Sequence, residues 1–471
     1  MFKRNAMGNT RAKLLASAVL MTLGLTAAGA AMSTNVGGGG ATLPAGGYVG
    51  WGFVASGAPS TIFSSNVTGK TGSAIDPTSL LGAWSGSGNT TPTHLVSYCQ
   101  TGSGGGKKIF DHSDGTATWG GAGQACSSTA SATSGFGGDT SIVDPHFVGS
   151  DAPMSQSEFN WFGNGTNLGN KATKYGQPVQ FPAVVGAVAI AYNLPGAPSL
   201  DLADAGLCRI FSGQVTNWNQ LSGTDFNTAP TTALPNLALK LAYRGDGSGT
   251  TYSLANHLAT VCTALPSSKF FQADQAFTTV AAQFTLPAGS VAGTGNPGVV
   301  AAISATSGAI GYAEAANLQH TSVSSTTRVA KVNGKDPYAN LSNSISISTL
   351  LVDKVINGFH SATDTGFVPG TPNVQALTGA TTAGCMLSAD PTTYANGVAG
   401  SYPILAVSNL IFNQKGNGSD LAAVRDLMSF TYSSTRRVGA TLIAPPAGGT
   451  TGYAFVNSPV ANAKINTCIT L

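Results

Sequence analysis

The turn at residues 244–250, RGDGSGT, combines residue types that bind oxyanions. The apolar residues before it predict a strand that delivers Arg244, and the apolar spacing after it predicts a helix from about Thr250. A helix N-terminus carries unpaired N–H groups and the positive end of the helix dipole, so it attracts anions. Ser248 and Thr250 add hydroxyl donors, and the planar guanidinium of Arg244 suits a tetrahedral oxyanion. The glycines, among them Gly249, let backbone approach a ligand, although a flexible turn before a capped helix would have the same sequence.

Spacing excludes two nucleotide-binding motifs. The glycines at 245, 247 and 249 lack the sixth-position glycine of the dinucleotide fingerprint, because Tyr252 occupies that position. The segment TGSGGGKK has Lys108 where a phosphate-binding P-loop requires serine or threonine. The glycine-rich turns therefore do not indicate a nucleotide site.

Three segments ahead of this turn carry similar chemistry. GGGGATLPAGG places Thr42 and the Leu43 N–H before a proline, a residue favoured in the first turn of a helix. YCQTGSGGGKK places Ser103 in a glycine loop before a possible helix, and FVGSDAPMSQSEF places Asp151 before a predicted helix opened by Pro153. Each segment alone fits ordinary loop chemistry, and Asp151 could simply cap that helix. The occurrence of all four segments in this order argues against coincidence.

The elements that must position these loops alternate between strands and helices. QFPAVVGAVAIAYNLPG, at 180–196, is dense in β-branched and small apolar residues and predicts one or two buried strands. The next segment predicts a helix that Ser199 or Asp201 caps and Gly213 ends. Residues 296–318 again read as a helix followed by a strand. This alternation predicts an α/β fold with a largely parallel sheet.

The first 31 residues have the pattern of a secretory signal peptide. Basic residues precede an apolar stretch that ends in AAGAA, with cleavage expected after Ala30 or Ala31. Four of the 22 basic residues leave with this signal, which leaves 18 against 19 acidic residues and a formal charge of −1. A nucleic-acid partner and direct membrane insertion are not expected, because the remaining chain has neither a basic excess nor an apolar run of spanning length. We expect a soluble mature protein.

Cysteine and histidine spacing predicts disulfides and no metal. Six cysteines in an exported chain predict up to three disulfides. Pairing of sequence neighbours, 99 with 126, 208 with 262 and 385 with 468, is one of several possible connectivities. No C-x-x-C pair and no metal-ligand spacing of histidines occurs, so neither a metal nor a cofactor is expected. His146 could act as a base beside Asp151, but a surface loop histidine is favoured.

The four loop segments resemble the ligand loops of the bacterial phosphate-binding protein (PstS family), the receptor of the phosphate ABC transporter, and of its secreted relatives, the DING proteins. GGGGATLP is similar to the DING signature, although Asn35-Val36 stands where that family has Ile-Asn. GSDAP and RGDGSGT match two further signatures, and GAIGYAEAANL resembles a segment near the hinge. The resemblance runs through residues 37–455 and leaves out the Gly/Ser/Thr tracts at 64–90 and 113–140, which predict surface loops or insertions.

The resemblance implies an α/β, two-lobed periplasmic-binding-protein fold of the class II type, with the ligand cleft between lobes joined by hinge strands. The hinge crossings are expected near residues 185–192 and 312–319. The implied division is a signal peptide at 1–31, the first part of lobe I at 32–190, lobe II at 191–316 and the second part of lobe I at 317–471.

The resemblance also implies a phosphate cage. Its expected members are Thr42, Leu43, Ser103, Asp151, Arg244, Ser248, Gly249 and Thr250, with Asp246 orienting Arg244. Asp151 is the unusual member, because two unit charges 3 Å apart repel by roughly 5 kcal/mol at an effective dielectric of 20. Monohydrogen or dihydrogen phosphate avoids this repulsion by donating its proton to the carboxylate, whereas sulfate near neutral pH has none. Asp151 is therefore expected to accept phosphate and reject sulfate.

The function expected first is an exported, monomeric protein that captures inorganic phosphate without chemistry. A periplasmic form would pass phosphate to an ABC permease in the inner membrane, and a secreted form would scavenge it outside the cell. The alternative is an enzyme, because some DING-like relatives are described as low-molecular-weight alkaline phosphatases, with Asp151 as a base and Arg244 balancing charge. No G-x-S-x-G nucleophile elbow accompanies these loops, so no catalytic residue is assigned. An extracellular matrix or adhesive protein, suggested by low charge and the Gly/Ser/Thr tracts, ranks third.

Overall fold

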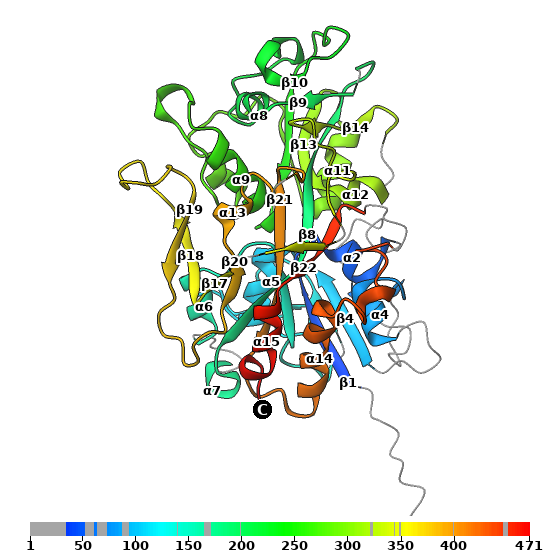
Figure 1. Ribbon diagram of the computed structural model, residues 1–471, viewed down its shortest axis with the longest axis vertical. Coiled ribbons are helices and arrows are strands. Elements are labelled where there is room, and N and C mark those ends of the chain that lie inside the picture. Colours follow the sequence, from blue (N-terminus) through cyan, green and yellow to red (C-terminus); the bar gives the residue numbers. More distant parts are fainter. Residues whose placement is uncertain are drawn as a thin grey trace, which may run out of the picture.

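The computed structural model shows a large mixed sheet with helices on both faces (Figure 1). The structure describes residues 34–51, 61–63, 73–86, 94–138, 140–163, 171–197, 199–320, 324–342, 344–347, 350–398, 400–445 and 451–471. The expected signal peptide at 1–31 lies outside the described residues, as does much of the 64–90 tract. Among the described residues, no helix has both the length and the apolar character needed to cross a membrane.

The main sheet contains thirteen of the described strands. Its principal strand order is β12 (Val291–Gly293), β11 (Lys240–Arg244), β13 (Ala309–Glu314), β8 (Pro178–Asn193), β21 (Leu405–Asn413), β7 (Phe147–Ser150), β1 (Thr34–Gly40), β4 (His94–Gln100), β2 (Thr61–Phe63) and β3 (Ser73–Ala74), with β14 (Thr327–Val329), β16 (Ser344–Ser346) and β22 (Tyr453–Asn457) pairing beside this path. Pairing is parallel for β4, β1 and β7 at one end and for β12, β11 and β13 at the other. It is antiparallel where β8 meets β13 and β21 and where β21 meets β7. The expectation of a largely parallel sheet is therefore right for these two groups of three strands, and wrong for the middle of the sheet and for β2, which pairs antiparallel with β4.

The strand β8 connects the two ends of the sheet. It is one continuous strand of 16 residues, all buried, as its predominantly apolar sequence predicts for a strand covered on both faces. Residues 178–187 pair with β21, whereas residues 188–192 pair with β13. We call the part that contains β1, β4, β7 and β21 the first half and the part that contains β11, β12 and β13 the second half. In Figure 1 the first half lies below and the second half above, with β8 running through both.

Helices pack along both halves of the sheet. They are α2 (Ala45–Val49), α4 (Leu80–Ser85), α5 (Gly102–Asp111), α6 (Gln156–Trp161), α7 (Lys171–Tyr175), α8 (Asp204–Phe211), α9 (Gly249–Val261), α10 (Phe277–Val280), α11 (Gly295–Ala305), α12 (Ala315–His320), α13 (Pro391–Tyr394), α14 (Leu421–Tyr432) and α15 (Pro459–Cys468). The predicted cap of α8 is wrong, because its N-cap is Ala203 and Asp201 lies in a strand. Asp201 instead accepts hydrogen bonds from Asn227 and Thr228. Gly213 follows the end of α8 with φ of 73°, the left-handed geometry that stops a helix.

Four smaller sheets complete the described fold. They are formed by β5 (Ala125–Cys126) with β6 (Ser134–Gly135), β9 (Asp201–Leu202) with β10 (Phe226–Thr228) and β15 (Lys331–Val332), β17 (Leu350–Val352) with β20 (Leu387–Ala389), and β18 (Lys354–Phe359) with β19 (Pro372–Ala376). The 113–140 tract is more than a surface loop, because Trp119 and Phe136 are buried and belong to a hydrophobic cluster of the first half. The tract is also covalently tied to β4 through Cys126.

All six cysteines form disulfides between sequence neighbours. The pairs are Cys99–Cys126, Cys208–Cys262 and Cys385–Cys468, so the expected connectivity is confirmed. Sequence-local pairing follows from the fold, since Cys208 on α8 and Cys262 at the end of α9 belong to helices that pack together.

Removal of the Cys385–Cys468 disulfide should lower the free energy of unfolding by about 2–5 kcal/mol, because this bond closes a long loop in the unfolded chain. The bond spans 83 residues and holds the C-terminal helix α15. The double serine variant and the unmodified protein would be compared by thermal unfolding without reductant. Equal melting temperatures would contradict the expectation.

Candidate anion-binding site

The RGDGSGT turn has the predicted strand, turn and helix. The strand β11 ends at Arg244, and α9 begins at Gly249. Ser248 is the N-cap of α9, and its hydroxyl oxygen accepts the Thr251 N–H at 3.1 Å. Its own N–H donates to the Gln275 carbonyl at 2.9 Å. Both polar groups of Ser248 thus have partners, and the capping role of Ser248 is confirmed.

Asp246 holds the buried guanidinium of Arg244. Arg244 donates from Nε to Asp246 Oδ1 at 2.7 Å and from Nη2 to Oδ2, and the Gly295 N–H donates to Oδ1 at 3.0 Å. Burial acts to lower the pKa of Arg244, but Asp246 outweighs it and the net direction is upward. Burial acts to raise the pKa of Asp246, and Arg244 reverses this to give a lowered value. Both groups therefore stay charged, and Nη1 is left to face the first half of the protein.

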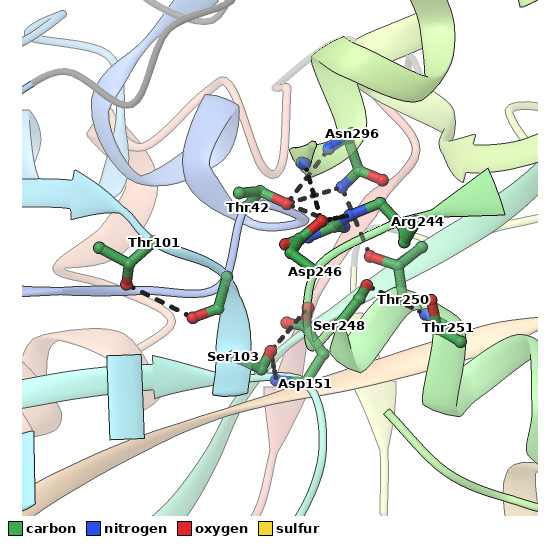
Figure 2. Close-up of polar contacts among 12 residues, drawn as sticks. Thr42, Thr101, Ser103, Asp151, Arg244, Asp246, Ser248, Thr250, Thr251 and Asn296 are labelled. Atoms are coloured by element: carbon green, nitrogen blue, oxygen red, sulfur yellow. Dashed lines mark hydrogen bonds and ion pairs between the residues drawn. The ribbon is translucent and has the colours of Figure 1, made fainter. Parts of the chain in front are cut away.

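Thr42 is the hydrogen-bond acceptor for Arg244 Nη1. It follows β1, and its hydroxyl oxygen accepts Arg244 Nη1–H at 3.2 Å (Figure 2). The next residue, Leu43, is buried, and its carbonyl accepts the Tyr453 hydroxyl at 2.6 Å. The bond to Arg244 holds the Thr42 loop against the second half of the sheet, and the bond to Tyr453 holds it against β22.

Ser103 and Asp151 lie together on neighbouring elements of the first half. Ser103 is the second residue of α5, and Asp151 directly follows β7. The Asp151 N–H donates to Ser103 Oγ at 3.1 Å, and the Ser103 hydroxyl lies 3.5 Å from Asp151 Oδ2. Asp151 does not cap α6, because that helix begins at Gln156 and Ser155 forms its capping box. The capping alternative for Asp151 is therefore wrong.

The glycines of the Ser103 segment are helical, contrary to the predicted glycine loop. They belong to α5, where their lack of side chains admits neighbouring backbone. A Cβ at Gly106 would lie 2.5 Å from Gly40 Cα, and the Gly104 N–H donates to the Gly247 carbonyl at 3.2 Å. Close backbone packing against Gly40 of β1 and Gly247 of the RGDGSGT turn explains the glycines at 106 and 104.

Gly249 of the second half packs closely against the first half. A Cβ added there would lie 2.4 Å from Asp151 Cβ and 2.6 Å from Ser103 Oγ. Residues from four loops, expected at one site, thus lie in one place: Thr42, Leu43, Ser103, Asp151, Arg244, Asp246, Ser248, Gly249 and Thr250.

Comparison with known proteins identifies the family. Residues 55–435 match the family model of a PBP superfamily domain. The chain belongs to the PBP superfamily. A phosphate-binding protein from an unknown prokaryotic organism is 30% identical over 328 residues, 66% of this chain and 77% of the relative. Alkaline phosphatase L from Pseudomonas aeruginosa strain UCBPP-PA14 is 29% identical over 350 residues, 72% of this chain and 76% of that protein.

A solved structure supports the same fold. PfluDING, a high affinity periplasmic phosphate-binding protein bound with phosphate, aligns with a TM-score of 0.55 and 23% identity over 91% of this chain and 92% of its own. The expected α/β periplasmic-binding-protein fold and the resemblance to phosphate-binding and DING-type proteins are therefore confirmed.

In this PBP-superfamily chain, Asp151 is an acid held out of water. Its side chain is 1% exposed, and Oδ1 has no hydrogen-bond partner of good geometry among the described residues. Burial raises the pKa of Asp151 to about 7, while the neighbouring Ser408 hydroxyl, Arg244 and Ser103 act in the opposite direction. Near neutral pH this carboxyl can therefore either accept or release a proton.

Asn296 belongs to the same cluster and was not predicted from the sequence. It lies in the first turn of α11, is fully buried, and places Nδ2 3.3 Å from Thr42 Oγ1 and 3.4 Å from Thr250 Oγ1. The available signal was an asparagine before Pro297 at a predicted helix start, which is equally typical of a helix with no ligand.

His146 is not a surface histidine, contrary to the favoured prediction. It is buried, with Nδ1 accepting the Gly37 N–H at 3.1 Å and Nε2 lying 3.2 Å from Asp420 Oδ2. Both ring nitrogens thus have partners away from Asp151, so the geometry gives His146 a structural role. Among the described parts of the chain, no three His, Cys, Asp or Glu side chains are grouped as metal ligands.

Proposed function

We propose that this protein captures inorganic phosphate between the two halves of its sheet. The observation that carries the proposal is one buried carboxyl, Asp151, facing a cluster of donors that includes the Arg244 guanidinium. Inorganic phosphate offers several oxygen acceptors and one proton near neutral pH, which matches a site with many donors and one acceptor. The relatives named phosphate-binding protein and PfluDING support the same ligand.

Discrimination against sulfate follows from the same carboxyl. Above its pKa of about 7, Asp151 is ionised, and a dianion without a proton would meet an uncompensated charge. That repulsion is roughly 5 kcal/mol at 3 Å and an effective dielectric of 20. Phosphate avoids the repulsion because its proton lies between the two oxygens.

The architecture supports binding by closure of two lobes. We propose that the first half forms lobe I and the second half lobe II, with β8 and β13 at the crossings. Residues 327–332, expected in lobe I, are assigned to lobe II in this proposal, because β14 pairs with β8 and β15 with β9. The signal-like N-terminus and three disulfides support export to the periplasm or beyond. A monomer that delivers phosphate to an ABC permease, or scavenges it outside the cell, fits this arrangement.

Phosphomonoester hydrolysis is the second candidate. It is favoured by one observation, the pKa of about 7 at Asp151, which suits a general base near neutral pH. The relative named alkaline phosphatase L gives the substrate class.

Titration calorimetry at pH 8 should show that phosphate binds and that sulfate binds at least about 100-fold more weakly. This ratio corresponds to about 2.7 kcal/mol, which is less than the repulsion estimated above. The same preparation would be assayed for p-nitrophenyl phosphate turnover, beside Arg244→Ala. We expect little turnover. Turnover that persists through purification and disappears in Arg244→Ala would support the enzyme instead, and equal binding of both anions would contradict selective phosphate capture.

A further inference from the structure

Asn296 connects hydroxyl groups from both halves of the protein. Thr42 follows β1 of the first half, whereas Thr250 lies in the first turn of α9 in the second. The Asn296 side chain is fully buried, and its Nδ2 lies within hydrogen-bond distance of both hydroxyl oxygens, at 3.3 and 3.4 Å (Figure 2). One amide group therefore contacts both sides of the proposed phosphate site.

The orientation of this amide is fixed by the backbone. Asn296 Oδ1 accepts the Glu314 N–H at 3.3 Å. Exchange of the amide oxygen and nitrogen would set two donors against each other at that contact, so Nδ2 must face the two threonines. The side chain therefore presents N–H groups, and only N–H groups, to both hydroxyls.

Thr42 Oγ1 is surrounded by donors. Arg244 Nη1 lies 3.2 Å away, the Asn296 backbone N 3.4 Å and Asn296 Nδ2 3.3 Å. None of these nitrogens can accept a hydrogen bond. The hydroxyl oxygen is thus used as an acceptor, and its own hydrogen must point in another direction. Thr250 Oγ1 likewise accepts from Asn296 Nδ2, which occupies one of its two lone pairs and turns its hydrogen away from Asn296.

The geometry points to Asn296 as a positioning residue that fixes the hydroxyls of Thr42 and Thr250 as donors to bound phosphate. The inference rests on the proposed function, because it assigns the free hydroxyl hydrogens to that anion. A hydroxyl that can rotate offers an anion either its hydrogen or its lone pairs, and only the first is attractive. Because Asn296 Nδ2 donates to both threonine oxygens, Asp151 remains as the acceptor for the phosphate proton.

The test compares phosphate affinity for Asn296→Asp and Asn296→Ala by titration calorimetry at pH 8. The carboxylate of Asn296→Asp has the size of the amide but would accept the threonine hydrogens, turning them away from phosphate and adding a negative charge. We expect a loss of at least about 100-fold for Asn296→Asp and about 10-fold for Asn296→Ala, the range of hydrogen bonds to charged groups. A residue that only fills space would give the opposite order, because the isosteric change would be milder.

A double-mutant cycle shows whether Asn296 affects phosphate affinity by orienting the Thr42 hydroxyl, and it uses variants that add no charge. If Asn296 acts through Thr42, the effect of Asn296→Ala should shrink at least about threefold in a Thr42→Val background, because the oriented hydroxyl is then absent. Asn296→Ala has the same effect in both backgrounds if the inference is wrong. This cycle does not depend on Asn296→Asp being folded, which thermal unfolding would check.

Asn193→Asp is the matched control. Asn193 is also buried, and its Nδ2 donates to the Ile303 and Ser304 carbonyls at the other end of α11. Its replacement should lower the melting temperature while changing phosphate affinity less than about threefold, since it touches no group of the site. A loss in Asn193→Asp equal to that in Asn296→Asp would overturn the inference, because general loosening of α11 would then explain both. Absence of phosphate binding by the unmodified protein would instead overturn the proposed function.

Discussion

Replacing Gly249 with alanine should weaken phosphate binding by about 100-fold or more while the protein remains folded. The added Cβ would lie 2.4 Å from Asp151 Cβ and 2.6 Å from Ser103 Oγ, distances at which real Cβ atoms are essentially never found. Since Asp151 and Ser103 are held by each other and by buried elements, the two halves must separate to admit the methyl group. Overpacking of this kind costs about 1–3 kcal/mol, and separation also lengthens the charge-assisted bonds to the anion.

Gly247→Ala is the control for this prediction. Gly247 lies in the same turn, but a Cβ there would meet only Gly104 Cα at 3.5 Å, an ordinary van der Waals distance. Its φ is also outside the left-handed region, so alanine adds no backbone strain. Titration calorimetry should show a loss below about threefold for Gly247→Ala. Similar losses in both variants would mean that flexibility of the turn, and not contact between the halves, explains the glycines.

Local sequence signals predicted the elements at the site and little of what holds them together. The end of β11 at Arg244 and the start of α9 after Ser248 follow from apolar spacing and capping chemistry, which act over a few residues. The long buried strand β8 could be predicted for the same reason, because a strand covered on both faces is predominantly apolar. The meeting of four loops came from the family resemblance, since no local signal reports contacts between residues as far apart in the chain as Thr42 and Arg244.

The errors have the same origin in tertiary contacts. The glycine run of α5 suggested a loop because glycine is a poor helix former, but contacts with Gly40 and Gly247 make it the residue that fits. His146 was expected on the surface, yet its partners are Gly37 and Asp420, each more than 100 positions away. Burial and pairing of such polar groups are decided by the assembled fold.

Asp151→Asn should reduce the selectivity for phosphate over sulfate and should stabilise the ligand-free protein at pH 8. The variant keeps the size of the side chain but replaces an acceptor of the phosphate proton by an amide that can donate as well as accept. At pH 8 we expect phosphate to bind at least about 10-fold more weakly and sulfate to bind more tightly than in the unmodified protein, since sulfate no longer meets a charge. Calorimetric titration of both anions would measure the two changes. An unchanged ratio of phosphate to sulfate affinity would show that Asp151 does not select the ligand.

In the absence of phosphate, the buried carboxyl of Asp151 should lower the free energy of unfolding as the pH rises. Burial raises the pKa of Asp151 to about 7, whereas an unfolded chain releases this proton near pH 4. Between about pH 4 and pH 7 the folded protein therefore holds a proton that the unfolded chain has lost, and the free energy of unfolding falls as the pH rises through this window. The total contribution is about 4 kcal/mol, complete above pH 7.

The amide introduced by Asp151→Asn cannot ionise, so the variant avoids that loss. In phosphate-free buffer at pH 8, Asp151→Asn should unfold at a higher temperature than the unmodified protein, and the difference should shrink as the pH approaches about 4. Saturating phosphate should narrow this difference at pH 8 by about 1.4 kcal/mol or more, the equivalent of a 10-fold loss of affinity, because the bound anion supplies the proton that the buried carboxylate lacks and stabilises the unmodified protein more strongly. A variant that is less stable at every pH, with or without phosphate, would show that Asp151 serves the fold and not the ligand.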